Sequence, residues 1–378
     1  MRGGLFSFLE RRAASPKSEP YQRCSATGLE YHAPDEEGRP LLKAVAYKEP
    51  GPIDREDALL DITLDKPVPQ GRDLLVKVAA VSVNPVDTKV RSAMGPENSE
   101  WRVLGFDAAG VVESVGPEVR NFQPGDAVFY AGSIHRPGTN SEFHLVDERI
   151  VGRKPGRLSD PEAAALPLTA ITAWEMLFDR LEVDRPTPQG GKTILVIGGA
   201  GGVGSITIQL LRALTDLEVI ATASRSETQS WVRECGAQHV IDHRSPLAPQ
   251  VEALGLGAPG FVFSTTQTQR HFSDIVELIA PQGRFGLIDD PDDLDPVPLK
   301  PKAVSLHWEF MFTRSLFLTP DMEEQGKLLN EVAKLVDGGR IRSTATEVAG
   351  KIDAATLRRV HALIESGSAR GKVVLEGF

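Results

Sequence analysis

The sequence predicts an α/β protein built from a mostly β domain and a doubly wound parallel sheet. Strand-like segments and Gly/Pro turns alternate from residue 42 onward. Apolar strands then alternate with amphipathic helices between residues 193 and about 312, and a glycine-rich turn joins the first of those strands to its helix. A chain of 378 residues is also long for a single core, so two domains are expected.

Charge and cysteine content narrow the class of function. The chain carries 42 basic and 52 acidic residues, a net charge of −10, without a basic block. This balance argues against binding to nucleic acid or to an anionic membrane surface. No apolar run approaches the roughly eighteen residues that a membrane span requires. Only Cys24 and Cys235 are present, so a disulfide framework is excluded and a cytoplasmic protein is expected.

Residues 1–41 are predicted to form an appendage outside the folded domains. The segment is polar and contains proline after a short apolar patch, and it has a slight excess of basic residues. A disordered tail explains this composition better than a secretory signal, because the apolar patch is short and no small-residue cleavage pattern follows it.

The first domain is predicted over residues 42–165. A capping-box spacing, Ser159 followed by Glu162, opens a helix through Ala165, and a helical pattern resumes from Ala170 to Leu181. The expected strands are 42–47, 73–83, 107–115, 126–130 and 141–146.

The second domain is predicted over residues 166–319. Ser226 and Gln229 have capping-box spacing at the start of its second helix, and Gly236 ends that helix after Cys235. The expected strands are 193–198, 218–223, 239–241, 260–264 and 283–288, and the expected helices are 203–214, 227–235 and 271–280.

The remaining segment, residues 320–378, is expected to return and complete the first domain. After Pro320 the pattern predicts a helix to about Val336 and a strand near 343–348. A helix over 353–364 and a last strand over 372–375 follow.

The turn between the first strand and helix of the second domain is predicted to hold a dinucleotide. Gly199, Gly201 and Gly204 occupy the G-x-G-x-x-G positions, with Gly202 and Val203 between the last two. The three glycines would serve a tight turn, close approach to a pyrophosphate, and packing of helix on strand. Backbone amides at the helix N-terminus would face the phosphates.

The end of the next strand favours NADP over NAD. An NAD site places Asp or Glu about twenty residues after the last glycine, on the ribose hydroxyls. This chain has Ser224 and Arg225 there instead. A hydroxyl and a guanidinium suit the additional 2′-phosphate of NADP, although Arg225 could also be a solvated loop residue.

Several phrases resemble the medium-chain dehydrogenase/reductase superfamily, in which a β domain precedes the glycine cradle. The phrases at 82–87, 104–110 and 124–128 are similar to its quinone oxidoreductase branch. The phrase at 306–315 is similar to a subgroup labelled zinc-type alcohol dehydrogenase-like. The resemblance implies a GroES-like mostly β catalytic domain, a Rossmann NADP-binding domain and, as in many relatives, a homodimer.

The zinc label and the residues disagree. The family's catalytic zinc is held by Cys, His and Cys where this chain has Asn84, Phe106 and, nearby, Leu168. Phe and Leu have no donor atoms, and an amide is a poor ligand for zinc. We therefore predict no zinc, although binding through other ligands stays open.

The resemblance also implies catalytic residues. Asn84 and Thr172 match positions beside the nicotinamide and the substrate oxygen, but they could instead be a turn residue before proline and an ordinary helical threonine. Asp87 could take part in proton transfer, although a turn-capping aspartate is the simpler interpretation.

Further cofactor residues follow from the same resemblance and from the edge of the sheet. His243 matches a position beside the adenine, and Lys372 lies in the family's closing Gly-Lys-x-Val phrase, although both could be ordinary surface residues. Thr265 and Ile288 follow strands whose carboxyl ends form the edge at which open α/β sheets bind ligands.

The expected activity is transfer of a hydride from NADPH to quinones or α,β-unsaturated carbonyls. Without a metal, such activated acceptors need less electrophilic help than a simple ketone, provided that donors stabilise the developing charge. Two alternatives stay open: a zinc-type alcohol dehydrogenase acting on alcohols or aldehydes, and a non-catalytic NADPH-binding protein on the same fold.

Overall fold

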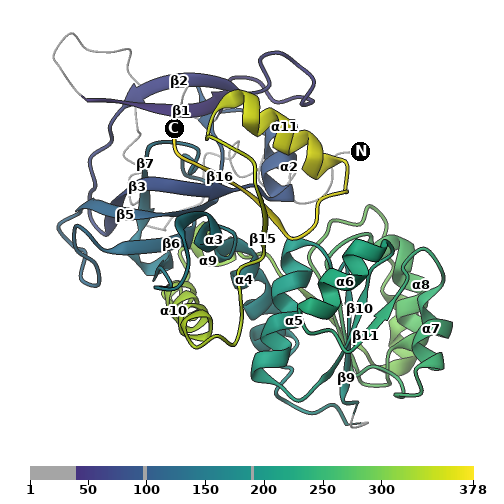
Figure 1. Ribbon diagram of the computed structural model, residues 1–378. Helices are drawn as coiled ribbons and strands as arrows, with labels where there is room; N and C mark the ends of the chain where they lie inside the picture. Colours follow the sequence, from purple (N-terminus) through teal and green to yellow (C-terminus); the bar gives the residue numbers. More distant parts are fainter. Residues whose placement is uncertain (1–39, 97–99, 189–190) are drawn as a thin grey trace, which may run out of the picture.

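The computed structural model describes residues 40–96, 100–188 and 191–378. It contains a β-rich body, drawn in purple and blue, and an α/β body, drawn in teal and green (Figure 1). The yellow C-terminal segment packs back on the β-rich body. Almost all of the predicted appendage lies outside the described residues, and the first strand begins at Leu41. Within the described residues, no helix is long and apolar enough to cross a membrane.

The β-rich body is organised around one seven-stranded sheet in the order β15-β16-β3-β5-β6-β8, with β7 also paired to β3. A smaller sheet has the order β2-β1-β4. The strands that precede the α/β body are β1 (Leu41–Tyr47), β2 (Leu60–Asp65), β3 (Asp73–Ser82), β4 (Arg102–Val103), β5 (Asp107–Val115), β6 (Ala127–Ala131), β7 (Phe143–Asp147) and β8 (Val151–Arg153). Sequence reasoning missed β2, β4 and β8. Strands β4 and β8 have only two and three residues, whereas β2 has a regular apolar alternation that was overlooked.

Short helical segments accompany these strands and lead into the α/β body. The predicted capping box is present, because the Glu162 side chain accepts from the Ser159 amide at 2.9 Å. The helical pattern after Pro167 continues into a π-helix, a rare form often found at functional sites. The helical segments here are α2 (Pro85–Ala93), η1 (Glu148–Ile150), α3 (Asp160–Ala164), α4 (Pro167–Trp174) and the π-helix η2 (Glu175–Arg180).

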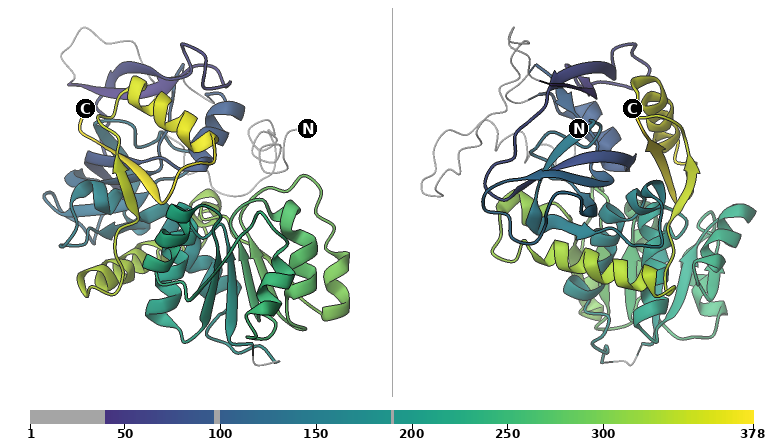
Figure 2. Two further views of the ribbon diagram at one scale, coloured as in Figure 1. Left: turned by 45° about the vertical axis from the view of Figure 1, so that its right-hand side comes forward. Right: turned by 60° about the vertical axis from the view of Figure 1, so that its left-hand side comes forward.

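The α/β body contains a six-stranded sheet in the order β11-β10-β9-β12-β13-β14, and every neighbouring pair is parallel. Helices cover both faces of this sheet (Figure 2). The predicted architecture is therefore confirmed: a doubly wound parallel sheet follows a mostly β body. Its strands are β9 (Thr193–Ile197), β10 (Glu218–Thr222), β11 (His239–Ile241), β12 (Phe261–Ser264), β13 (Arg284–Leu287) and β14 (Ser305–Trp308).

Several local predictions in this body need correction, including the helix expected over 271–280, which begins at Thr268. Helix α6 begins one residue early, because Thr228 rather than Gln229 accepts from the N-cap amide, which belongs to Arg225. Sequence reasoning also missed α7 and β14. The helical segments are α5 (Gly202–Leu214), α6 (Ser226–Glu234), α7 (Leu247–Ala253), α8 (Thr268–Leu278), η3 (Val297–Lys302) and α9 (Thr313–Phe317).

The C-terminal segment returns to the β-rich body. Strand β16 (Lys372–Glu376) pairs antiparallel with β3, and β15 (Ala345–Val348) pairs with β16. Helix α10 (Glu324–Asp337) packs beside β8, where Asn330 accepts from the Arg153 amide at 2.9 Å. Helix α11 (Ala354–Glu365) lies against α2. These pairings support the assignment of 320–378 to the first domain, and we propose the domain boundaries as predicted.

Candidate functional site

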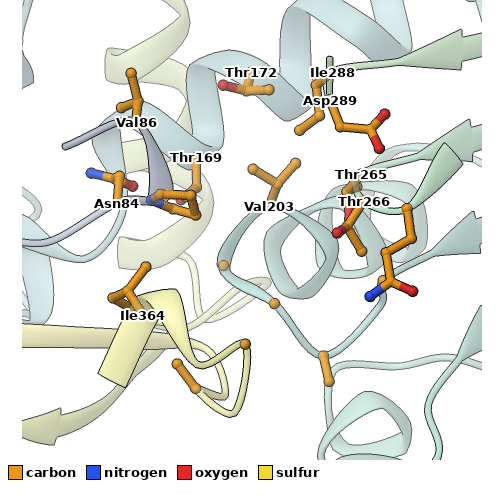
Figure 3. Close-up of a pocket in the computed structure, with 18 of the residues that line it drawn as sticks. Asn84, Val86, Thr169, Thr172, Val203, Thr265, Thr266, Ile288, Asp289 and Ile364 are labelled. Atoms are coloured by element: carbon orange, nitrogen blue, oxygen red, sulfur yellow. The ribbon is translucent and has the colours of Figure 1, made fainter. Parts of the chain in front are cut away.

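A cleft of about 1040 Å³ lies between the two bodies. Figure 3 shows Asn84 and Thr169 on one side of it, with Val203 and Thr265 across from them. The predicted site residues that line it are Asn84, Thr172, Gly201, Gly202, Val203, Ser224, Arg225, His243, Thr265, Ile288 and Lys372. Gly199, Gly204 and Asp87 lie outside the lining.

The glycine cradle is shaped by steric contacts. A Cβ on Gly204 would lie 2.3 Å from the Gly198 oxygen, so only glycine lets α5 pack this closely on the turn. A Cβ on Gly201 would meet only that oxygen, at 3.5 Å, which leaves room for a ligand. Because α5 starts at Gly202, its first amides have no acceptor within the helix and can bind phosphate oxygens.

One role in the cradle differs from the sequence prediction. The left-handed conformation that a tight turn needs belongs to Gly198, with φ of 81°, and not to Gly199. Gly199 is constrained by packing instead, since its Cβ would lie 2.9 Å from that of Ala221. The neighbouring strand supports the turn, because the Gly198 amide donates to the Thr222 hydroxyl at 2.9 Å.

Ser224, Arg225 and His243 all line the cleft. The Arg225 guanidinium donates to the Ser368 carbonyl at 2.9 Å and pairs with Glu227 at 3.2 Å. Burial lowers the pKa of His243, so its imidazole favours the neutral form. A neutral ring beside a cationic guanidinium suits a nucleoside that carries a phosphate.

Lys372, which also lines the cleft, forms the centre of a buried polar network. Its ammonium donates to the Val83 carbonyl at 3.0 Å, to the Asn84 side-chain oxygen, and to Asp107 at 3.2 Å. Asn84 Nδ2 donates to the same carboxylate oxygen at 2.8 Å. This arrangement fixes the amide orientation: the oxygen of Asn84 faces Lys372, and one amide hydrogen is used by Asp107. One N–H of Asn84 remains for a ligand.

Asp107 is a functional candidate that sequence reasoning missed. It is fully buried, pairs with Lys372, and also accepts from the Leu168 amide at 2.7 Å. Burial lowers the pKa of Lys372, whereas Asp107 counteracts this shift. The sequence signal is an acidic residue at the start of a strand whose next five residues, 108–112, are apolar or glycine.

Asp87 has the geometry of a turn cap. Its carboxyl oxygens accept from the Asn84 amide at 2.8 Å and from the Gly105 amide at 3.1 Å. Burial raises its pKa to about 7. Because Asp87 does not line the cleft, the geometry favours the turn-capping interpretation over a role in proton transfer.

Thr172, Thr265 and Ile288 border the middle of the cleft (Figure 3). The Thr172 hydroxyl donates to the Leu168 carbonyl at 2.9 Å, which leaves its oxygen lone pairs able to accept. The Thr265 hydroxyl donates to the Ile197 carbonyl at 2.9 Å, and its oxygen lies next to Gly198 of the glycine turn.

Aromatic packing occupies the position where the resemblance described above implies a zinc-binding histidine. Phe106 is buried and meets Phe312 edge-to-face, with ring centroids 4.9 Å apart. The Asn84 amide is already engaged by Lys372 and Asp107. The described residues contain no group of three or more His, Cys, Asp or Glu side chains placed to hold a metal ion. This donor set does not fit a catalytic zinc.

The C-terminal segment also contacts the cradle, which sequence reasoning did not anticipate. The Gly371 amide donates to the Ala200 carbonyl at 2.9 Å, and Gly371 bridges to Gly201 as in a parallel sheet. Lys372 follows directly, so one short segment links the glycine turn to the buried network. The sequence offered no signal for this contact beyond the closing Gly-Lys pair.

Two family models match the chain. One, the alcohol dehydrogenase GroES-like domain, matches residues 70–157. The other, a zinc-binding dehydrogenase model, matches residues 235–375.

Relatives with similar sequences agree with these models. A zinc-type alcohol dehydrogenase-like protein of Staphylococcus aureus is 39% identical over 336 residues, covering 88% of this chain and 99% of that protein. The human mitochondrial NAD(P)H oxidoreductase RTN4IP1 is 30% identical over 335 residues, covering 80% of this chain and 81% of that protein.

Solved structures share the fold. A Rhizobium etli protein, described as a candidate zinc-dependent alcohol dehydrogenase, is 63% identical with a TM-score of 0.89, over 90% of this chain and 99% of that one. A mycobacterial protein complexed with NADPH is 27% identical with a TM-score of 0.74, and the match covers 89% of this chain and 99% of that one. Escherichia coli quinone oxidoreductase is 23% identical with a TM-score of 0.74, and the match covers 88% of this chain and 99% of that one. At this identity the match establishes a shared fold only. The chain therefore belongs to the medium-chain dehydrogenase/reductase superfamily, an oxidoreductase family.

Proposed function

We propose that this protein is an NADPH-dependent oxidoreductase that reduces quinones or α,β-unsaturated carbonyls without zinc. One observation carries the proposal: a single cleft joins the glycine cradle to the Asn84–Lys372–Asp107 network, and the phenylalanine pair stands where a metal ligand would be needed. The cradle suits a dinucleotide, and the network holds one amide donor in a fixed orientation.

In this proposal, one group of residues binds the cofactor and another contacts the substrate. The first amides of α5 would bind the pyrophosphate, and Ser224 with Arg225 would bind the 2′-phosphate. The remaining N–H of Asn84 would donate to the substrate carbonyl oxygen as negative charge develops there. Thr172 would accept from the carboxamide of the nicotinamide. When bound, the nicotinamide supplies a hydride.

Turnover tests this proposal. NADPH oxidation should be observed with quinones and enones, should be weak with simple aldehydes, and should survive a chelator. Metal analysis of the purified protein accompanies the assay. Stoichiometric zinc together with loss of turnover on chelation would establish the zinc-type alcohol dehydrogenase instead, which the names of the Staphylococcus and Rhizobium relatives favour. NADPH binding without turnover on any acceptor would establish a non-catalytic binding protein.

The 2′-phosphate assignment makes a separate prediction. Replacing Ser224→Asp together with Arg225→Ala removes a cation from the phosphate site and adds an acid suited to ribose hydroxyls. The NADPH/NADH ratio of kcat/KM should fall by about 100-fold, since charge-assisted contacts to a phosphate contribute roughly 1.5–3 kcal/mol. The matched control is Arg244→Ala, an exposed arginine outside the cleft that pairs with Asp242. An unchanged ratio would contradict the assignment.

We also propose a cytoplasmic location and a homodimer. Strand β14 ends the order of the six-stranded sheet, so its outer edge is available for pairing with the same strand of a second copy.

A further inference from the structure

One ion pair crosses the cleft from the β-rich body to the α/β body. The Lys89 ammonium, carried by α2, donates to Asp290 Oδ2 at 2.9 Å. Both residues line the cleft, and their side chains are 43% and 30% exposed. They are 201 residues apart in the chain, so the pair forms only where the two bodies meet. Because an ion pair this exposed contributes little to stability, the fold alone does not account for its position in a ligand cleft.

The ion pair lies beside the part of the cleft where the acceptor would bind. Lys89 follows Val86 by three residues on α2, so the two share a helix face one turn apart. Asp290 follows Ile288 by two residues, just beyond the end of β13. Figure 3 shows Val86 near Asn84 on one side of the cleft, with Ile288 across from them. The pair therefore joins the two walls that would enclose the acceptor.

Lys89 keeps hydrogen-bond donors for a ligand. An ammonium group has three N–H bonds, and within residues 40–96, 100–188 and 191–378 the partner of this one is Asp290. Lys372, which also lines the cleft, is buried and donates to three protein oxygens. Lys89 can therefore offer two N–H groups to a molecule in the cleft, whereas the donors of Lys372 are already used.

Two donors thus stand along one helix of the cleft wall. Asn84 is the N-cap of α2 and Lys89 is its fifth residue, so their backbones lie about 7.5 Å apart along the helix axis. Pro85 and Val86, between them in the chain, add apolar surface to the same lining. A flat ring with an oxygen at each end matches this order of donor, apolar surface and donor. A 1,4-quinone has two such oxygens, whereas a simple enone has one.

We propose that Lys89 binds the second carbonyl oxygen of a quinone and so makes quinones the preferred acceptors. This inference rests on the proposed function, in which Asn84 donates to the first carbonyl oxygen. The quinone accepts a hydride, gains negative charge on its oxygens and takes up one proton from water to give the hydroquinone, while NADPH becomes NADP⁺. An ammonium group beside the second oxygen stabilises this charge through a charge-assisted hydrogen bond. A simple enone has no second oxygen to receive it.

The variant Lys89→Met tests this role, because methionine keeps an unbranched side chain but has neither charge nor donor. The kcat/KM for 1,4-naphthoquinone should fall by about 10-fold to 100-fold, whereas that for 2-cyclohexen-1-one should stay within about twofold of wild type. Calorimetric titration with 1,4-naphthohydroquinone under nitrogen, with NADP⁺ present, should show a matching loss of affinity. Lys89→Arg retains a cation with N–H donors, so most of the quinone preference should persist.

The matched control is Lys334→Met, which removes a helix lysine that pairs with Glu331 outside the cleft and should leave both acceptors unaffected. If the Lys89 pair only tied the two bodies together, Lys89→Met would change the two acceptors by the same factor or would change neither. Either result would overturn the inference, as would a wild-type protein that reduces the enone but not the quinone. The proposed function would stand in each of these cases. Absence of turnover with both acceptors would overturn the inference and the proposed function together.

Discussion

Lys372→Met should remove most of the enone reductase activity and destabilise the fold. The substitution leaves Asp107 fully buried without its cationic partner, and breaking such a pair typically costs about 3–5 kcal/mol. It also frees the Asn84 amide to rotate, because the Asn84 side-chain oxygen loses its donor. Loss of an oriented donor at a developing oxyanion lowers kcat by about 10²–10³-fold. Urea unfolding and steady-state kinetics measure the two effects.

The double variant Lys372→Met with Asp107→Asn separates these two causes. Neutralising Asp107 removes the uncompensated buried charge, so most of the lost stability should return. Activity should not return, because Asn84 still lacks the ammonium that orients it. Recovery of both properties, or of neither, would show that the network does not orient Asn84 in the way proposed.

Gly204→Ala should abolish tight NADPH binding by distorting the cradle. The new Cβ would lie 2.3 Å from the Gly198 oxygen and 2.7 Å from the Gly199 Cα, and both atoms belong to the backbone. The turn and the start of α5 must therefore separate, which costs about 1–3 kcal/mol of stability. Thermal melting and NADPH titration report the two losses.

Gly201→Ala is the matched comparison for this cradle variant. Gly201 has φ of −75°, which alanine adopts without strain, and a Cβ there meets only the Gly198 oxygen at 3.5 Å. Stability should stay within about 0.5 kcal/mol of wild type. NADPH affinity should fall by about tenfold or more, corresponding to roughly 1.4 kcal/mol, because the methyl group occupies the approach to the pyrophosphate. Equal melting temperatures for the two alanine variants would contradict the packing role of Gly204.

Local patterns determined the order of the elements well. The alternation of apolar strands and helices predicted the parallel sheet, and capping signals placed the starts of helices at Ser159 and near Arg225. These features depend on neighbours a few residues apart, so they can be seen in a linear sequence. The missed strand β14 is short and has no buried residues, and such a strand gives a weak pattern.

The glycine cradle shows the limit of this reasoning within a single motif. The sequence placed the cradle correctly between β9 and α5, because its glycines follow a strand and open a helix. It could not distinguish the glycine that needs a left-handed backbone, Gly198, from the one excluded by a neighbouring side chain, Gly199. That distinction depends on Ala221, which belongs to another strand.

The sequence by itself determined the two-domain α/β fold, the family, and the location of the glycine-rich turn between β9 and α5, because each depends on residue patterns of short range. Only the tertiary structure decided which side chains meet in the cleft. Lys372 reaches Asn84 across 288 residues of chain, and Glu309 reaches Arg180 across 129. Such contacts arise where strand β16 pairs with β3 and where β14, at the edge of the sheet, lies beside the π-helix. No local pattern encodes them, since they depend on how distant elements pack.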